Sequence, residues 1–229
     1  MMQKINMKKT IVISLGGSII VPKEYDLELL KEFISILRSN LDKYRFIVCC
    51  GGGYICRKAA QVLLDFGITD HDERDRVGIK AICLNAEVVR ALFEKDAYKD
   101  VEHDYDKQVE FDKVLICSAW ETGHTSDFDA VKFSIQYGGY KLINLTNVDY
   151  IYDSDPKDNP SAKPLPKLTW QDYKDIFGDE YVPSMHAPFD PVASKLARDN
   201  DLSVYILKGM KNLAKVLNDE EFEGSLLSN

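Results

Sequence analysis

Two apolar runs, each ending in a cluster of glycines, constrain the fold of this chain more than any other feature of its sequence. Residues 10–15 lead into Gly16-Gly17-Ser18, and residues 45–50 lead into Gly51-Gly52-Gly53, with a helical pattern after each cluster. Continuous apolar runs are typical of strands buried in a parallel sheet, and the helix after each strand covers a face of that sheet. The sequence therefore predicts an α/β fold, a three-layer αβα sandwich with a mostly parallel central sheet.

The alternation of strand and helix continues along the chain. Polar capping residues and a proline in a first turn predict helices that begin after Asp26, near Asp127, after Thr169 and at Pro191. Apolar spacing predicts further helices over residues 55–66, 74–94 and 211–217, and strands over residues 113–117, 141–145 and 202–207. Residues 148–167 are rich in proline and aspartate and predict a projecting hairpin or loop.

Composition and charge exclude several classes of protein. The chain has 229 residues, of which 45% are hydrophobic, so it can bury the core of one large domain. Its formal net charge of −8 repels nucleic acid and anionic lipid, and neither is expected as a partner. The five cysteines lack zinc-type spacing, and no apolar stretch reaches membrane-spanning length, in residues 1–9 or later. Reduced thiols and a cytoplasmic location are expected.

Both glycine clusters are expected to bind phosphate groups. Glycine allows close approach to the backbone, and the N–H groups at a helix N-terminus attract anions. A parallel sheet places both clusters at its carboxyl edge, where ligands of open α/β folds bind. Neither cluster is a P-loop, and simple tight turns are the alternative. Arg57 follows Gly53 by four residues and is placed to reach the same anion, although an exposed helix arginine is commonly solvated.

A third candidate segment, residues 120–127, follows a predicted strand and leads into a helix. Its small polar residues suit an anion or ribose at the helix N-terminus. Asp127 has two interpretations here, as a cap of that helix and as a carboxylate of the site. His124 is interpreted as a turn or substrate-lining residue, because the four histidines show no metal-ligand spacing.

Six motifs follow one another along the chain. Five of them are Ser14-Leu-Gly-Gly-Ser18, Gly51-Gly-Gly-x-x-x-Arg57, Asp75-x-x-Gly78, Gly123-His-Thr-Ser-Asp127 and Asp190-Pro-x-x-x-Lys195, and the sixth is Thr146-Asn-Val-Asp-Tyr-Ile-Tyr152-Asp-Ser-Asp155. The sixth is similar to the nucleotide-binding signature of the amino acid kinase superfamily. Each motif is modest alone, but together they span nearly the whole chain, and their order resembles that of the uridylate (UMP) kinases of the archaeal type within that superfamily.

The resemblance implies an amino acid kinase-like fold and an ATP-dependent transferase, with Mg²⁺ as cofactor, that phosphorylates UMP to UDP in pyrimidine biosynthesis. It implies catalytic roles for Lys195, Asp127 and Arg57. The residues implied for ATP are Gly17, Ser18, Gly53, Arg57, Thr146, Tyr152 and Asp155. Those implied for UMP are Gly52, Asp75, Trp120, Glu121, Thr122, Gly123, His124, Thr125 and Ser126. No metal ligand is assigned.

The resemblance also implies a single domain over residues 1–229, with an acceptor-binding lobe to about residue 140 and an ATP-binding lobe from about residue 141. A homo-oligomer is expected, and the family resemblance suggests a hexamer. Each expectation concerns the whole chain rather than one motif.

Two departures from the superfamily pattern leave alternatives open. Ser14 stands where many members have lysine, and Tyr150 stands where the signature usually has glycine. One alternative is a kinase of the same fold that acts on isopentenyl phosphate, acetylglutamate, carbamate or a phosphonate. Asp75 argues against the isoprenoid, because a carboxylate suits ribose hydroxyls better than an apolar tail. The other alternative is a nucleotide-binding or storage protein without turnover.

Overall fold

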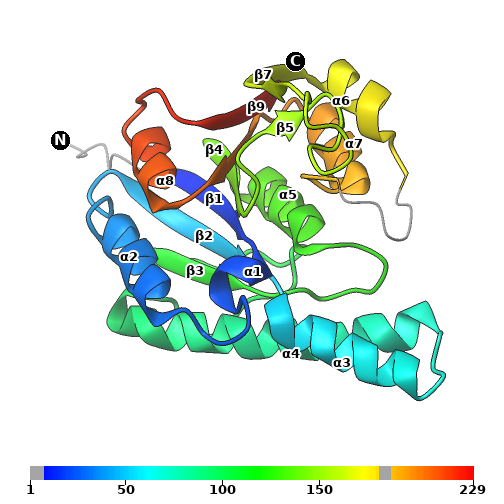
Figure 1. Ribbon diagram of the computed structural model, residues 1–229. Coiled ribbons are helices and arrows are strands. Elements are labelled where there is room, and N and C mark those ends of the chain that lie inside the picture. The colour runs from blue at the N-terminus through cyan, green and yellow to red at the C-terminus, as the bar shows by residue number, and fades with distance from the viewer. Residues whose placement is uncertain (1–7, 181–186) are drawn as a thin grey trace.

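The computed structural model describes residues 8–180 and 187–229 (Figure 1). Residues 1–7 and 181–186 of the predicted domain lie outside the described residues. The strands are β1 (Lys9–Leu15), β2 (Tyr44–Cys50), β3 (Val114–Cys117), β4 (Lys141–Thr146), β5 (Ile151–Tyr152), β6 (Pro164–Leu165), β7 (Lys167–Thr169), β8 (Val204–Lys208) and β9 (Gly224–Ser228). The helices are α1 (Gly17–Ile20), α2 (Leu27–Arg38), α3 (Gly53–Asp65), α4 (His71–Phe93), the 3₁₀ helix η1 (Glu94–Asp96), α5 (Ser126–Tyr137), α6 (Trp170–Phe177), α7 (Pro191–Asp199) and α8 (Met210–Leu217).

A seven-stranded sheet in the order β3-β2-β1-β4-β8-β9-β7 forms the centre of the molecule. The five strands from β3 to β8 are mutually parallel, while β9 pairs antiparallel with β8 and parallel with β7. The predicted mostly parallel sheet is therefore confirmed. The proline-rich segment forms the predicted hairpin, because β5 and β6 pair with each other in a small antiparallel sheet.

Two apolar cores lie on opposite faces of the sheet. Ile11 and Ile13 of β1 point into a core that α2, α8 and the second half of α4 complete. Val12 points the other way, into a core shared with α5, α6 and α7. Alternate side chains of a strand point to opposite faces, so continuous apolar strands require helices on both sides. The three-layer αβα sandwich is confirmed (Figure 1).

Most of the predicted helix starts are confirmed by side-chain caps. Asp26 accepts a hydrogen bond from the Leu29 backbone N–H at 3.0 Å, and Thr169 forms a capping box with Asp172 at the start of α6. Asp190 caps α7 by accepting from two backbone N–H groups. The interpretation of Asp127 as a cap is wrong, because the Thr125 hydroxyl accepts from the Asp127 backbone N–H. The carboxylate of Asp127 is thereby left for other contacts.

The predicted helix over residues 55–66 exists, but the rest of the described chain covers its apolar face only in part. Of the residues in α3 only Gly53 is buried, and Phe66, just after the helix, is 83% exposed. α3 packs beside α4, and together they project beyond the sheet (Figure 1). Apolar spacing predicts an apolar face but not the surface that covers it.

Strand β9, at the C-terminal end of the chain, is not predicted by the sequence patterns.

The sheet runs without a break through both predicted lobes, since β1 pairs with β2 on one side and with β4 on the other. The division near residue 140 thus falls between α5 and β4, within one layered structure, and remains a prediction. Within residues 8–180 and 187–229, no helix is both long and apolar enough to cross a membrane.

Candidate active site

The carboxyl ends of the parallel strands bring the predicted site segments to one edge of the sheet. The two glycine turns follow β1 and β2, residues 118–125 follow β3, and the nucleotide-signature segment follows β4. In an open parallel sheet this edge is the usual ligand-binding side. Segments more than a hundred residues apart in the sequence therefore meet in one region.

The two glycine turns are in direct contact with each other. A Cβ atom added to Gly17 would overlap the backbone nitrogen of Gly53, and one added to Gly53 would overlap the carbonyl oxygen of Gly17. Gly53 also has a φ of 59°, in the left-handed region that favours glycine. Side chains are excluded from this contact. We call the joined backbone of residues 16–18 and 51–53 the glycine cradle.

Hydrogen bonds with neighbouring segments hold the glycine cradle in place. The backbone N–H of Gly16 donates to the Leu145 carbonyl, and that of Gly51 donates to the Leu15 carbonyl, each at 3.0 Å. Buried Asn85 of α4 donates its amide to the carbonyls of Gly51 and Gly52, at 2.9 and 3.0 Å. In the first turn of α3, the N–H groups of Tyr54 and Cys56 donate to the carbonyls of Val21 and Gly52. Those of Gly53 and Ile55 have no backbone acceptor among the described residues and suit an anion.

Sequence reasoning missed the role of Asn85. The signal available was a polar residue on the apolar stripe of a long helix, beside Ala86 and Val89, which are fully buried. A buried side-chain amide needs hydrogen-bond partners, so its presence predicts a polar neighbour from another segment. The Tyr25 hydroxyl supplies one more contact by donating to the Asn85 side-chain carbonyl at 3.1 Å.

Asp127 lies between β1 and the start of α7. The Ser14 hydroxyl donates to one of its carboxylate oxygens at 2.8 Å, and the Asp190 backbone N–H donates to the other at 3.3 Å. Burial raises the pKa of Asp127 to about 6; the hydrogen bond from Ser14 opposes that rise, while the negative charge of Asp190 adds to it. The structure thus joins the motifs of Ser14, Asp127 and Asp190 around one carboxylate.

Asp190 completes this cluster of acidic side chains. One of its carboxylate oxygens caps α7, and the other is buried without a hydrogen-bond partner among the described residues. A neighbouring negative charge favours the protonated form of a carboxyl group, so Asp190 adds to the cost of ionising Asp127.

The two predicted catalytic cations lie at the surface. Arg57 is exposed on the second turn of α3, and Lys195 is exposed on α7, five residues after Asp190. Neither forms a salt bridge with another residue in the described parts of the chain. Both side chains are therefore available to an anionic ligand, and their catalytic roles stay predictions.

The segment 120–126 meets Asp75, as the predicted acceptor site requires. The Asp75 carboxylate accepts a hydrogen bond from the Gly123 backbone N–H at 2.9 Å, across a sequence separation of 48 residues. The Tyr105 hydroxyl donates to Glu121 at 2.9 Å, and the Trp120 ring lies edge-on to that of Tyr105. We call residues 120–126 the acceptor loop.

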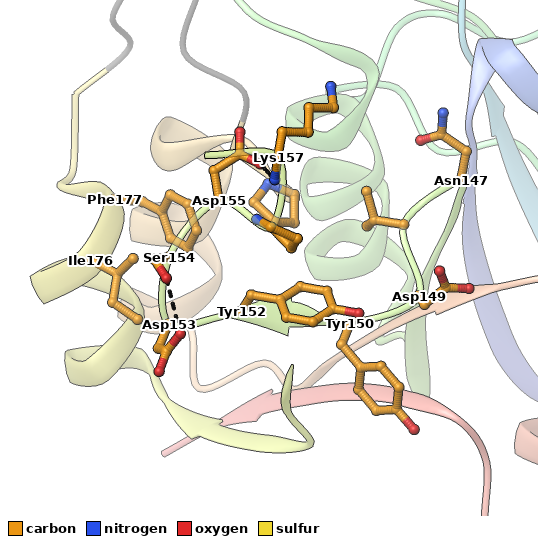
Figure 2. A pocket seen from close by; sticks show the side chains of 13 residues that line it. Asn147, Asp149, Tyr150, Tyr152, Asp153, Ser154, Asp155, Lys157, Ile176 and Phe177 are labelled. Carbon is orange, nitrogen blue, oxygen red and sulfur yellow. Dashed lines mark hydrogen bonds between the residues drawn. The ribbon is translucent and has the colours of Figure 1, made fainter. Parts of the chain in front are cut away.

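A cavity of about 580 Å³ opens beside the segment that follows β4. Its lining includes the predicted nucleotide residues Tyr152 and Asp155 (Figure 2). Thr146 is not part of this lining, but its Cα lies 3.7 Å from a Cβ built on Gly16, so it joins the cavity segment to the glycine cradle. One short segment of the chain thus connects the cavity lining to the glycine cradle.

The cavity has lining residues that sequence reasoning did not assign. Ile176 and Phe177 at the end of α6 line it, together with Pro188. Tyr150, which replaces the glycine of the signature, also lines the cavity, and its ring lies edge-on to Tyr152 with 6.4 Å between the ring centres (Figure 2). No sequence motif marks the end of α6, because those side chains reach the cavity only through the tertiary fold.

The sequence and the fold were compared with known proteins. A sequence model of the amino acid kinase family matches residues 9–208. The uridylate kinase of Methanobrevibacter smithii is 29% identical over 224 residues, which cover 95% of this chain and 99% of that protein. The uridylate kinase of Thermococcus kodakarensis is 30% identical over 201 residues, which cover 86% of this chain and 89% of that protein.

Solved structures agree with the sequence matches. The crystal structure of the uridylate kinase from Archaeoglobus fulgidus superposes with a TM-score of 0.81 at 27% identity, covering 96% of this chain and all of that one. The UMP kinase from Bacillus anthracis superposes with a TM-score of 0.75 at 20% identity, which speaks for the fold alone.

Proposed function

The chain belongs to the amino acid kinase family, and from that premise we propose that it is a transferase that moves the γ-phosphoryl group of ATP to UMP, giving UDP and ADP. The observation that carries the proposal is the glycine cradle, because two strand-terminal turns in contact provide neighbouring anion sites between a ring-sized cavity and the acceptor loop. Uridylate kinases related over nearly the whole chain support UMP as the acceptor.

In this proposal ATP occupies the cavity after β4. Its nucleoside contacts Thr146, Tyr152 and Asp155, which lie in the segment between β4 and the β5–β6 hairpin. Its phosphates lie on the glycine cradle near Gly17, Ser18, Gly53 and Arg57. Aromatic side chains stack on flat bases, and glycine backbone at a helix N-terminus suits phosphate, so both halves of the donor meet matching chemistry.

UMP occupies the opposite side of the glycine cradle. Its phosphate lies at Gly52, its ribose hydroxyls at Asp75, and its base at the acceptor loop. The Asp75 carboxylate has already accepted one backbone N–H, and its remaining lone pairs are free for ribose hydroxyls. This placement assigns the acceptor to residues before about 140 and the nucleoside of ATP to residues after about 141, while the phosphates of ATP lie on the glycine cradle, which belongs to the first of the two predicted lobes.

Phosphoryl transfer requires alignment and positive charge around a loose, anionic transition state rather than covalent help from the protein. Backbone N–H groups of the glycine cradle, Arg57 and Lys195 supply that charge, while Asp127 orients the cationic groups. Mg²⁺ bound with ATP would supply further positive charge to the phosphates. Among the described residues, no group of three or more side chains could hold a metal ion.

ADP release with and without UMP tests the proposal directly. The enzyme with ATP and Mg²⁺ is expected to release ADP only when UMP is present, with UDP formed in equal amount. ADP release that depends on isopentenyl phosphate or acetylglutamate instead would identify another acceptor. Tight ATP binding with no turnover of any acceptor would favour a nucleotide-storage protein.

The assignment of donor and acceptor to separate places has its own test. Calorimetric titration of Asp75→Asn is expected to show weaker UMP binding with ATP affinity nearly unchanged, because Asp75 faces the acceptor loop. Tyr152→Ala is expected to show the reverse, because Tyr152 lines the cavity. Equal losses for both nucleotides in either variant would contradict the division.

Family membership also bears on the pathway, the location and the oligomeric state of the protein. We infer a role in pyrimidine nucleotide biosynthesis in the cytoplasm, which follows from UMP and ATP as substrates. We also infer a homo-oligomer, with the hexamer that the family resemblance suggests. Uncovered apolar side chains on and after α3, namely Val62, Leu64, Phe66 and Ile68, support self-association.

A further inference from the structure

A buried acid lies directly beneath the acceptor loop. Asp129, in the first turn of α5, is 1% exposed, and neither of its carboxylate oxygens has a hydrogen-bond partner among the described residues. One basic side chain lies close to it: His124 of the acceptor loop, whose Nε2 is 3.5 Å from Asp129 Oδ1. His124 Nε2 is itself buried and otherwise unpaired. Each group is the natural partner of the other.

The surroundings make this pair costly to break. A buried carboxylate without a partner is strongly disfavoured, and removing one member of a buried pair costs more than removing both. Burial raises the pKa of Asp129, and His124 opposes that effect, while the negative charge of Glu121 adds to it. Lys132 of the same helix lies over the rings of Tyr105 and Phe128 rather than in a salt bridge with Asp129.

Three consecutive residues, Gly123, His124 and Thr125, are each held by a different contact. The contact with Asp129 is one of those that hold His124. The Gly123 N–H is bound by Asp75, His124 packs against Phe128 with 4.2 Å between ring centres, and Thr125 caps α5. The polypeptide from 123 to 125 thus has little freedom as long as all three contacts persist. Of these contacts only the one to His124 depends on a buried charge.

We propose that Asp129 is a positioning residue for the acceptor: its buried carboxylate contacts the imidazole of His124 and thereby holds the acceptor loop in the shape that receives UMP. The inference rests on the proposed function for the identity of the ligand, but the contact between Asp129 and the loop does not. Asp129 itself lies under the loop and takes no direct part in the reaction.

Hydrogen exchange in the nucleotide-free protein tests the contact without reference to activity. Asp129→Ala and the size-matched Asp129→Asn are expected to speed exchange of the acceptor-loop amides about tenfold, the effect of losing one buried contact to a charged group. Ser134→Ala is the matched control, because it removes a buried, unpaired hydroxyl from the same helix. Unchanged loop exchange in both Asp129 variants would overturn the proposal.

Stability and kinetics supply the readouts that a merely structural residue would not give. His124→Phe alone is expected to lower the melting temperature, and adding Asp129→Ala is expected to restore part of the loss, because no unpaired charge then remains. Asp129→Asn is expected to raise the KM for UMP about tenfold while kcat and the KM for ATP stay within about twofold.

The outcomes separate this proposal from the function on which it rests. Faster loop exchange with a raised KM for UMP supports both. Faster exchange with an unchanged KM for UMP supports the contact but contradicts the acceptor loop as the UMP site, and with it the positioning role. Additive effects of the two substitutions on melting temperature would contradict the pairing itself.

Discussion

The Ser14 hydroxyl influences how readily the Asp127 carboxyl group ionises. Where the superfamily resemblance expects a lysine, this chain offers a neutral hydroxyl that donates to Asp127 at 2.8 Å. A lysine would hold the carboxylate ionised, whereas a hydroxyl stabilises the charge only in part. The pKa of Asp127 accordingly stays near 6, and its charge changes close to neutral pH.

The first prediction concerns this ionisation. If ionised Asp127 orients the cations of the site, kcat falls as the pH drops through about 6. Ser14→Ala removes a hydrogen bond that lowers this pKa, so the acid limb of the kcat profile is expected to move up by about one pH unit. Ser14→Thr keeps the hydroxyl and serves as the control. An acid limb at the same pH in Ser14→Ala would contradict the role of the hydroxyl.

The raised pKa of Asp127 has a consequence for stability as well. Because the folded state favours the protonated carboxyl group, protonation of Asp127 stabilises the fold. This stabilisation is fully present below the ordinary carboxyl pKa and is lost as the pH rises through about 6. Asp127→Asn removes the titration, and its free energy of unfolding is expected to depend less on pH across that window. Urea titrations at several pH values measure the difference.

Lys195 carries the second prediction. A cation directed at the transferred group is felt mainly in the transition state, so Lys195→Ala is expected to lower kcat about a hundredfold or more with a smaller effect on the KM for UMP. Lys43→Ala is the control, because Lys43 is exposed just before β2, at the opposite edge of the sheet. Unchanged turnover in Lys195→Ala would remove this side chain from the mechanism.

At the residue scale, motifs name candidate site residues but not the residues that support them. Asp75 and the acceptor loop were assigned by resemblance, and the structure places them in contact. Asn85 and Asp129 were not assigned, because each acts on another segment through a contact that only the fold creates. A buried polar residue in a helix is visible in the sequence only as an interruption of its apolar stripe.

At the scale of elements, the contact between the two turns of the glycine cradle is the decisive feature. Gly17→Ala is expected to destabilise the protein by several kcal/mol and to abolish ATP binding, because the new methyl group would overlap the backbone at Gly53. Gly67→Ala is the control: its Cβ would meet open space, and only the strain of a φ of 80° remains, about 1 kcal/mol. Wild-type ATP affinity in Gly17→Ala would contradict the cradle as the phosphate site.

Element prediction succeeded where local signals were strong. Asp26, Thr169 and Asp190 stand at helix starts as capping chemistry requires. β9 was missed, because its five residues lack a long apolar run and pair antiparallel with β8 only after the chain has turned back. The apolar face of α3 was predicted but assigned to the core, since periodicity carries no information about which surface covers a helix.

At the scale of the whole molecule, the projecting pair of α3 and α4 predicts self-association. Phe66→Glu is expected to shift the protein to a smaller species in size-exclusion chromatography with light scattering, because a charge cannot be buried in an apolar interface. Phe66 is already 83% exposed in the single chain, so the fold should survive. Glu28→Gln, a surface change on α2, is the control. A wild-type protein that is monomeric would contradict the inferred oligomer.

The overall architecture was predictable because it follows from patterns that repeat along the chain. Apolar strands followed by glycine turns and helices imply a parallel sheet covered on both faces, whatever the details of each turn. The division into an acceptor-binding lobe and an ATP-binding lobe does not follow from such patterns. One sheet passes through both halves, so only ligand binding distinguishes an acceptor side from a donor side.

The central claim is that this site transfers phosphate to UMP, and acceptor selectivity tests it most directly. The measurement is kcat/KM for UMP, CMP, AMP and GMP with ATP and Mg²⁺, with the diphosphate product identified by chromatography. Groups matched to uracil are left unpaired when cytosine binds, so a preference for UMP over CMP of about a hundredfold or more is predicted. Equal turnover of UMP and CMP, or no UDP at all, would contradict the account.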